Sequence, residues 1–252
     1  MAAEGSSSID ALGQFKLTPA FGYIGESWNF TQSNLMMLAS GILVTLLLYI
    51  GMKPRAMVPG RLQAAAEMGY ETIMNMCVDT IGEEGRRYFP FVFTLFFFIL
   101  FGNLMGVFPL FFTFTSHIMV TLALSATVFI LVTVVALKEH GLHFFSYFVP
   151  QGIPKMLIPL MVLIEVISYL SRIISLSVRL FANMMAGHVM LEVFGAFIVM
   201  LGGMGLLGYF PAALSFGVNT ILIGFELLVA TLQAYVFAVL TCIYLHDAVH
   251  LH

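Results

Sequence analysis

The sequence predicts an all-α integral membrane protein with about five membrane-crossing helices plus an interfacial helix, the last two crossing helices forming a long, strongly tilted antiparallel hairpin. Three observations predict this fold. Of the 252 residues, 60% are hydrophobic and only 9% are charged, whereas a soluble domain carries about 25% charged residues. The apolar residues gather in runs long enough to cross about 30 Å of hydrocarbon as helices. A glycine-rich turn joins the two longest runs.

Composition and charge divide the chain into six parts. They are an extracytoplasmic N-terminal segment 1–32, a first transmembrane helix 33–52, an interfacial amphipathic segment 57–86, a transmembrane hairpin 88–138, a cytoplasmic-side loop 139–155 and the long tilted hairpin 156–250. The N-terminal segment lacks the basic start and short apolar core of a secretory signal, so we expect it in the mature protein. Segment 57–86 mixes apolar and charged residues, which favours a helix at the membrane surface. A solvated loop with some helix is the alternative.

If the chain crosses the membrane five times, the connections between crossings that carry lysine or arginine alternate with connections that carry none. The basic residues lie at 53–61, 86–87, 138 and 155, whereas the connection 113–117 and the glycine turn 202–211 carry none. Basic connections remain on the cytoplasmic side. We therefore expect the N-terminus outside and the C-terminus in the cytoplasm of a bacterial inner membrane, with the mitochondrial inner membrane as the less favoured location.

The first arm of the last hairpin, residues 156–201, is too long for an ordinary bundle helix. As a helix it would extend roughly 70 Å, against a hydrocarbon core of about 30 Å. It must tilt strongly, bend or leave the bilayer. A helix that follows the outside of another membrane object has a use for this length.

Polar residues form one stripe on each arm of this hairpin. The first arm carries Glu165, Ser168, Arg172, Ser175, Arg179, Asn183 and Gly187, at steps of three or four residues, and the second carries Asn219, Glu226, Gln233 and Asp247, at multiples of seven. Such spacings put each set on one helix face. Each ionisable group inside a membrane costs roughly 2.5–3.5 kcal/mol, so the groups that persist are expected to face protein or water.

Folding the two arms about residue 206 brings the stripes into register. The register predicts Arg179 opposite Gln233, Glu165 opposite Asp247, and His188 within about one turn of Glu226. Arg179 keeps its charge in any protein environment and is therefore the strongest candidate for a functional group, a structural ion pair with Glu226 or Glu165 being the alternative. A histidine beside a carboxylate can relay protons near neutral pH. For the Ser, Asn and Gln side chains, hydrogen bonding between helices is the alternative role.

No cofactor, metal or nucleic acid is expected. The net charge is −3 and no basic run is present, which disfavours nucleic acid. Cys77 and Cys242 are far apart in sequence and have neither metal-binding spacing nor a disulfide framework. No second histidine lies at a depth that would let it share a haem with His188.

Three segments resemble a known family. Residues 175–188 read Ser-Leu-Ser-Val-Arg-Leu-Phe-Ala-Asn-Met-Met-Ala-Gly-His, residues 231–237 read Thr-Leu-Gln-Ala-Tyr-Val-Phe, and residues 103–106 read Asn-Leu-Met-Gly, followed by Pro109. Together they resemble subunit a of F-type ATP synthases, from about Trp28 to the C-terminus. His188 and the stretch 144–154 resemble the mitochondrial and alphaproteobacterial branch. Many other bacterial members carry an acid at the His188 position and a histidine at the Glu226 position, so the pair is exchanged here.

The resemblance implies a non-catalytic, proton-translocating stator subunit of a rotary ATP synthase. Its partners would be the c-ring, the peripheral-stalk subunit b, the other ATP synthase subunits and membrane lipid. Arg179 would separate two offset half-channels. Topology then assigns Glu165, Ser175 and Asp247 to the inner half-channel, and His188, Glu226 and Asn219 to the outer one. Asn183 and Gln233 would position Arg179 or water, Arg172 would add positive potential on the inner side, and Asn103 would close the outer channel or serve only in helix packing.

Two other functions compete with this one. A self-contained, proton-coupled secondary transporter often shows internal repeats with paired broken helices. The sequence has no second copy of the Arg179 segment, and five spans do not divide into matched halves. A structural anchor within a respiratory complex would leave Arg179, Glu226 and Gln233 without a purpose.

Overall fold

The computed structural model describes residues 31–52, 60–108, 113–141, 144, 157–205 and 208–250. Nearly all of the expected N-terminal segment, most of the expected loop 139–155 and the basic residues Lys53, Arg55 and Lys155 lie outside the described residues. Within them, all the long elements are helices: α1 (Gln32–Met52), α2 (Arg61–Ile81), α3 (Gly85–Val107), the short 3₁₀ helix η2 (Phe114–Ser116), α4 (Ile118–His140), α5 (Ile158–Gly202) and α6 (Tyr209–Val249).

Five of these helices, all but α2 and η2, are long and apolar enough to cross a membrane. The predicted all-α membrane fold with a long C-terminal hairpin is therefore confirmed. The helix bounds differ slightly from the expected ones. α3 begins at Gly85 and ends at Val107, while the expected hairpin began at 88.

Within the segment 57–86, which was expected at the membrane interface, residues Arg61–Ile81 form the helix α2, and its place at the interface stays a prediction. Its apolar face is buried against α1, α3 and α6, and the charged residues Glu67, Glu71 and Asp79 are exposed. On the buried face, Cys77 Sγ lies 3.7 Å from Cys242 Sγ of α6. The two cysteines, remote in sequence, are thus buried neighbours that remain free thiols.

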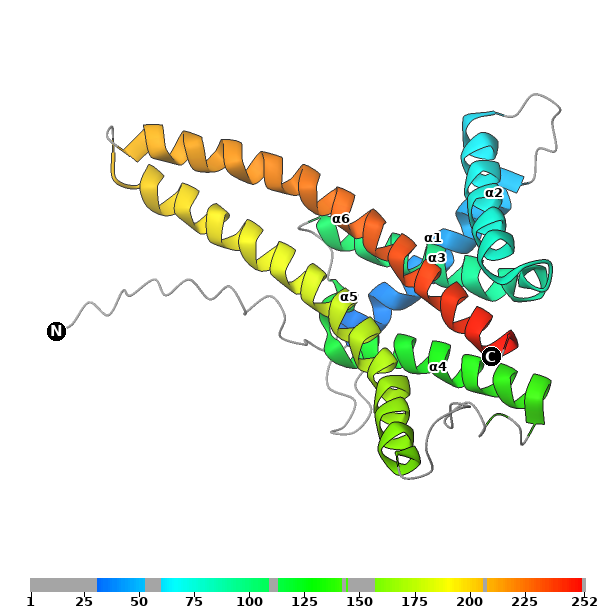
Figure 1. Ribbon diagram of the computed structural model, residues 1–252. Helices are drawn as coiled ribbons and strands as arrows, with labels where there is room; N and C mark the ends of the chain where they lie inside the picture. Colours follow the sequence, from blue (N-terminus) through cyan, green and yellow to red (C-terminus); the bar gives the residue numbers. More distant parts are fainter. Residues whose placement is uncertain are drawn as a thin grey trace.

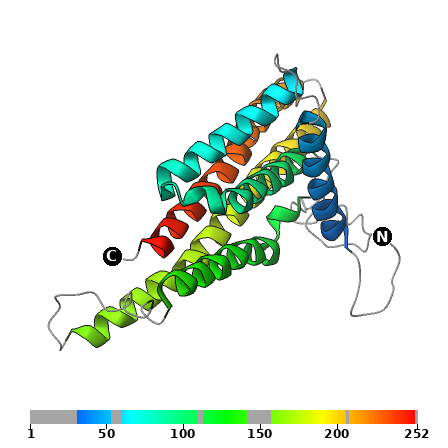
Figure 2. The same ribbon diagram turned by 90° about the vertical axis from the view of Figure 1, so that its right-hand side faces the viewer.

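The turn end of the long hairpin extends away from the other helices (Figure 1), and a view turned by 90° shows both arms running side by side (Figure 2). Its arms hold 45 and 41 residues, or roughly 68 and 62 Å of helix, about twice the hydrocarbon thickness. Gly205 at the turn has a φ of 77°, a left-handed conformation that glycine adopts without steric cost. The chain reverses here, close to the predicted centre at residue 206.

The stretch of α6 from Ala230 to Cys242 lies at the buried centre of the molecule. Ala230, Ala234, Ala238 and Cys242 follow one another at steps of four residues and are fully buried. Small side chains let neighbouring helices approach closely, and α6 contacts α2, α3, α4 and α5. The partner stripe on α5 consists of Leu176, Leu180, Met184 and His188, all buried. These helices hold the polar stripes in fixed positions.

Candidate functional site

His188 and Glu226 meet between α5 and α6, as the hairpin register predicted. His188 Nδ1 lies 2.9 Å from Glu226 Oε1, and both side chains are buried, with 9% and 4% of their surfaces exposed. Gly187 makes the approach possible, because a methyl group there would lie 2.8 Å from the same carboxylate oxygen. The contact is at ion-pair distance, yet neither carboxylate oxygen of Glu226 accepts a well-aligned hydrogen bond from any described residue.

Thr113 closes the other side of the His188 ring. It precedes η2, and its hydroxyl contacts Nε2 of His188 while donating a hydrogen bond of 3.2 Å to the carbonyl of Gly106 on α3. Sequence reasoning missed Thr113, because the connection 113–117 was notable only for lacking lysine and arginine. No periodicity marks a single threonine between two helices.

Asn183 and Gln233 form the next contact along the hairpin. Asn183 Nδ2 donates a 2.7 Å hydrogen bond to Gln233 Oε1, and Asn103 of α3 donates one of 3.2 Å to the carbonyl of Ala230. The expected opposition of Arg179 and Gln233 is therefore replaced by a pairing one turn further along α5. Arg179 remains nearby, one turn from Asn183 on the same helix.

Several buried polar atoms in this region have no hydrogen-bond partner among the described residues. They are Asn103 Oδ1, Asn219 Oδ1, both carboxylate oxygens of Glu226 and Gln233 Nε2. An unpaired buried polar group costs about 1–3 kcal/mol, and such groups in proteins usually bind ordered water. The seam between α5 and α6 on the Glu226 side therefore has the chemistry of a hydrated path.

Arg179 lies on the exposed edge of α5 and has no hydrogen bond or ion pair with any described residue. The neighbouring exposed positions on this edge carry small side chains, namely Ser168, Ser175, Ala182 and Ala186. They lie eleven, four, three and seven residues from Arg179, respectively, which keeps them within about 60° of it around the helix. The guanidinium is thus presented on a smooth surface that another helix can approach closely.

Arg172, seven residues earlier, has the opposite environment. Its Nη1 lies 3.1 Å from Asp247 Oδ2 of α6, and its guanidinium carbon lies 5.8 Å from the ring centre of Tyr169 and 5.1 Å from that of Tyr244. Asp247 was expected opposite Glu165, and this expectation is wrong. Glu165 is half-buried and has no hydrogen bond or ion pair within the described part of the chain.

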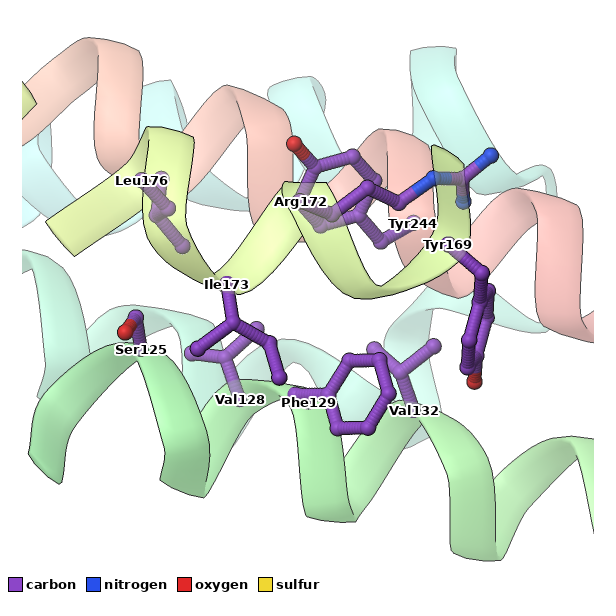
Figure 3. A pocket seen from close by; sticks show the side chains of 9 residues that line it. All are labelled: Ser125, Val128, Phe129, Val132, Tyr169, Arg172, Ile173, Leu176 and Tyr244. Carbon is purple, nitrogen blue, oxygen red and sulfur yellow. The ribbon is translucent and has the colours of Figure 1, made fainter. Parts of the chain in front are cut away.

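A small cavity of about 10 Å³ lies beside Arg172 and is lined by residues of α4, α5 and α6 (Figure 3). That volume is at the lower limit for one water molecule. Its walls are mostly apolar side chains, including Val128, Phe129 and Leu176. The two tyrosines that flank Arg172 were also missed in the sequence, although a signal existed. Tyr169 precedes Arg172 by three residues and Tyr244 precedes Asp247 by three, a spacing that puts each pair on one helix face.

The fold and these contacts define a multi-pass α-helical membrane protein with ionisable groups between its two longest helices. Residues 34–246 match the family model of the ATP synthase A chain. ATP synthase subunit a of Granulibacter bethesdensis is 60% identical over 100% of both chains. That of Gluconacetobacter diazotrophicus is 59% identical over 96% of this chain and 98% of the relative, and that of Acidiphilium cryptum is 56% identical over 98% of each. The chain belongs to the ATP synthase A chain family.

Proposed function

We propose that this chain is the stator subunit a of a rotary F-type ATP synthase in the bacterial inner membrane. In this role it forms two offset proton half-channels and couples proton flow to rotation of the c-ring, without itself carrying out ATP chemistry. The observation that carries the proposal is Arg179, a permanent charge exposed on an edge of small side chains and without a counter-ion in the described residues. An uncompensated charge within the span is costly unless another chain or water faces it.

The outer half-channel follows the buried polar atoms. Asn219, Glu226 and His188 would carry protons from the turn end of the hairpin toward its middle. Asn183 and Gln233 would orient water beside Arg179, and Asn103 would close this path from α3. The unpaired oxygens of Glu226 and Asn219 support the assignment, since water would satisfy them.

The inner half-channel lies toward the other end of the hairpin. Glu165 and Ser175 would guide protons to the cytoplasm, and Asp247 with Arg172 would form its other side. The ion pair between Arg172 and Asp247 keeps this second arginine from acting as a free charge. The positive-inside pattern supports the orientation, with the N-terminus outside and the C-terminus in the cytoplasm.

Arg179 would act on a carboxylate of the rotating ring. A fixed positive charge favours the ionised form of an approaching carboxyl and so promotes proton release. The same charge repels a proton that passes straight between the half-channels. Each proton crossing 100 mV releases about 2.3 kcal/mol, which a leak would dissipate. Further partners would be the peripheral-stalk subunit b, the other ATP synthase subunits and membrane lipid.

Cysteine crosslinking tests the docking of the ring. Ala182→Cys is exposed on the same edge as Arg179 and should crosslink to a cysteine at mid-span of the ring subunit in the assembled complex. Ile174→Cys is the matched control, because Ile174 is 60% exposed but points about 140° away from Arg179 and about 80° away from Ala182 around the helix. Equal crosslinking at both positions, or none at Ala182→Cys, would contradict the docking. The native cysteines are buried and do not compete.

The transporter alternative makes a different prediction for the isolated chain. A secondary transporter would move protons when reconstituted alone in liposomes. The stator proposal expects little flux until the ring is present, because the two half-channels do not connect without it. Substantial coupled transport by the purified chain alone would favour the alternative.

A further inference from the structure

We propose that Thr113 is a positioning residue that keeps a proton on Nε2 of His188, so that the mobile proton of the site is confined to the contact between Nδ1 and Glu226. The inference rests on the proposed proton-conducting function and deepens it. It assigns a role to a residue in the connection between α3 and α4, and it excludes a relay that passes through the imidazole ring from one nitrogen to the other.

The hydroxyl of Thr113 is held in place from several directions. Thr113 is 6% exposed, and its own carbonyl accepts hydrogen bonds from the Ser116 hydroxyl at 2.6 Å and the Ser116 N–H at 3.3 Å. A methyl group at Gly106 would lie 2.5 Å from Thr113 Cγ2 and 2.6 Å from Oγ1. The side chain therefore has little freedom to turn away from α3 or from His188.

Counting protons assigns the donors. A threonine hydroxyl has one proton to donate and can also accept. The carbonyl of Gly106 can only accept, and it belongs to the last turn of α3, whose carbonyls have no N–H partner within the helix. If the hydroxyl proton goes to this carbonyl, the contact with His188 is satisfied only when Nε2 carries a hydrogen and Thr113 Oγ1 accepts it. This is the one assignment that satisfies both contacts of the hydroxyl.

The assignment fixes the chemistry on the other side of the ring. A neutral imidazole with its hydrogen on Nε2 presents a lone pair at Nδ1, and Glu226 Oε1 lies 2.9 Å from this nitrogen. Two acceptors at that distance repel unless a proton lies between them. The pair therefore holds one proton, either on the carboxyl or on Nδ1. Transfer breaks the carboxyl O–H bond and forms the Nδ1–H bond, which leaves a carboxylate beside an imidazolium, and the reverse step restores the neutral pair.

The charged and titratable groups near His188 lie on α4, α5 and α6. Glu226 of α6 is an acid within ion-pair distance. Glu192 lies one turn further along α5 and Arg179 nine residues earlier. The described residues of α3 and η2 next to the ring are uncharged. Burial lowers the pKa of His117 at the start of α4, so this histidine stays neutral at neutral pH and adds no competing charge.

Three variants in the assembled complex test the inference, with proton flux measured in inverted membrane vesicles across a range of pH. In Thr113→Val the imidazole is free to carry its hydrogen on Nδ1 and to donate it to the Glu226 carboxylate. The contact between the two side chains then needs no additional proton. The alkaline limb of the pH–rate profile should then move toward acid by about one pH unit, the equivalent of one hydrogen bond. Thr113→Ser restores the hydroxyl and should restore the profile.

Thr115→Val is the matched control. Thr115 is fully buried two residues away, and its hydroxyl has no hydrogen-bond partner among the described residues. Its removal should leave the profile in place. An unshifted profile in Thr113→Val, or equal shifts in Thr113→Val and Thr115→Val, would overturn the inference.

Nitrogen NMR of the histidine-labelled complex gives a readout that does not depend on flux or on the stability of the variants. The His188 signals, identified by their loss in His188→Gln, should show a protonated Nε2 at every pH. A neutral ring with its hydrogen on Nδ1 would overturn the inference. Failure of the proposed function would be recognised separately, as flux that is unchanged in Arg179→Ala, whereas failure of this inference alone would leave Arg179 essential.

Discussion

Two arginines seven residues apart on α5 have opposite surroundings, and the difference comes from α6. Arg172 meets Asp247 and lies between two tyrosine rings. Arg179 has no ion pair or hydrogen bond in the described part of the chain. An arginine charge cannot be removed by deprotonation. Of the two guanidiniums, only that of Arg179 is therefore available to a group on another chain.

At the same scale, the site depends on the absence of a side chain at Gly187. In Gly187→Ala the new methyl group would lie 2.8 Å from Glu226 Oε1 and 3.1 Å from Cδ, so the carboxylate must move away from His188. Misplacement of a reacting group by about 1 Å lowers rates by up to about a hundredfold. We therefore expect proton flux through the assembled complex to fall by about tenfold to a hundredfold in Gly187→Ala.

Gly195→Ala is the control for this prediction. It lies on the same helix, and a methyl group there would meet nothing within 4 Å among the described residues. Its flux should match that of the unmodified chain. Comparable losses in both variants would mean that helix propensity, rather than the Glu226 position, determines the result.

Single residues were predicted with uneven success, for a physical reason. Arg179, His188 and Glu226 stood out because charge and polarity are rare in apolar helices and their spacing is periodic. Thr113 could not be found in this way, since a threonine in a connection has no periodic context and is common in proteins. Its importance arises only when the fold places it against His188.

At the scale of helices, the hairpin pairs residues in a drifting register. Two contacts between the arms show the drift: His188 pairs with Glu226, and Arg172 pairs with Asp247. The two α5 members are 16 residues apart (172 to 188), whereas the two α6 members are 21 residues apart (226 to 247). A fixed register about the turn assumes two straight antiparallel helices whose axes do not diverge. The predicted pairing of residues therefore holds near the turn and fails toward the other end of the hairpin. For this reason His188 and Glu226 were paired correctly, and Glu165 and Asp247 were not.

The ion pair between Arg172 and Asp247 links the two arms at the inner end. In Asp247→Asn the Arg172 guanidinium loses its carboxylate partner, about 10 Å along α5 from Arg179. We expect slower ATP-driven proton pumping, because this charge would compete with Arg179 for the ring carboxylate. The double variant Arg172→Gln with Asp247→Asn removes both charges and should recover most of the loss. The expected coupling is about 1–2 kcal/mol.

A double variant whose loss of pumping equals the sum of the losses in the two single variants would contradict this account. That result would mean that Asp247 acts by itself, for example as a proton carrier in the inner half-channel. The pair is partly exposed, with 22% and 36% of the side-chain surfaces accessible. Its effect on stability should therefore be small, and the pumping rate is the better measurement.

For the whole molecule, composition and hydropathy were sufficient to predict the fold class. Long apolar runs that must satisfy their backbone groups in lipid have little choice but to form helices. The way that α2 lies against α1, α3 and α6 was not predictable, because its amphipathic pattern fits a membrane surface and a protein surface equally well. The buried neighbours Cys77 and Cys242 are a direct result of that packing.

The orientation of the whole chain can be tested by labelling. Met204→Cys places a thiol at the exposed turn of the hairpin, and His250→Cys places one at the exposed end of α6. A membrane-impermeant maleimide should label Met204→Cys in spheroplasts and His250→Cys only in inverted vesicles. The reverse pattern would contradict the inside position of the C-terminus. The native cysteines are buried and provide a low background.

The most direct measurement of the central claim is proton movement through the assembled complex carrying Arg179→Ala. The account predicts that ATP-driven pumping is lost, while protons leak passively through the complex because no fixed charge separates the two half-channels. Arg87→Ala is the matched control, since it removes an arginine that is 73% exposed and remote from the hairpin seam. Normal coupled pumping in Arg179→Ala would contradict the account.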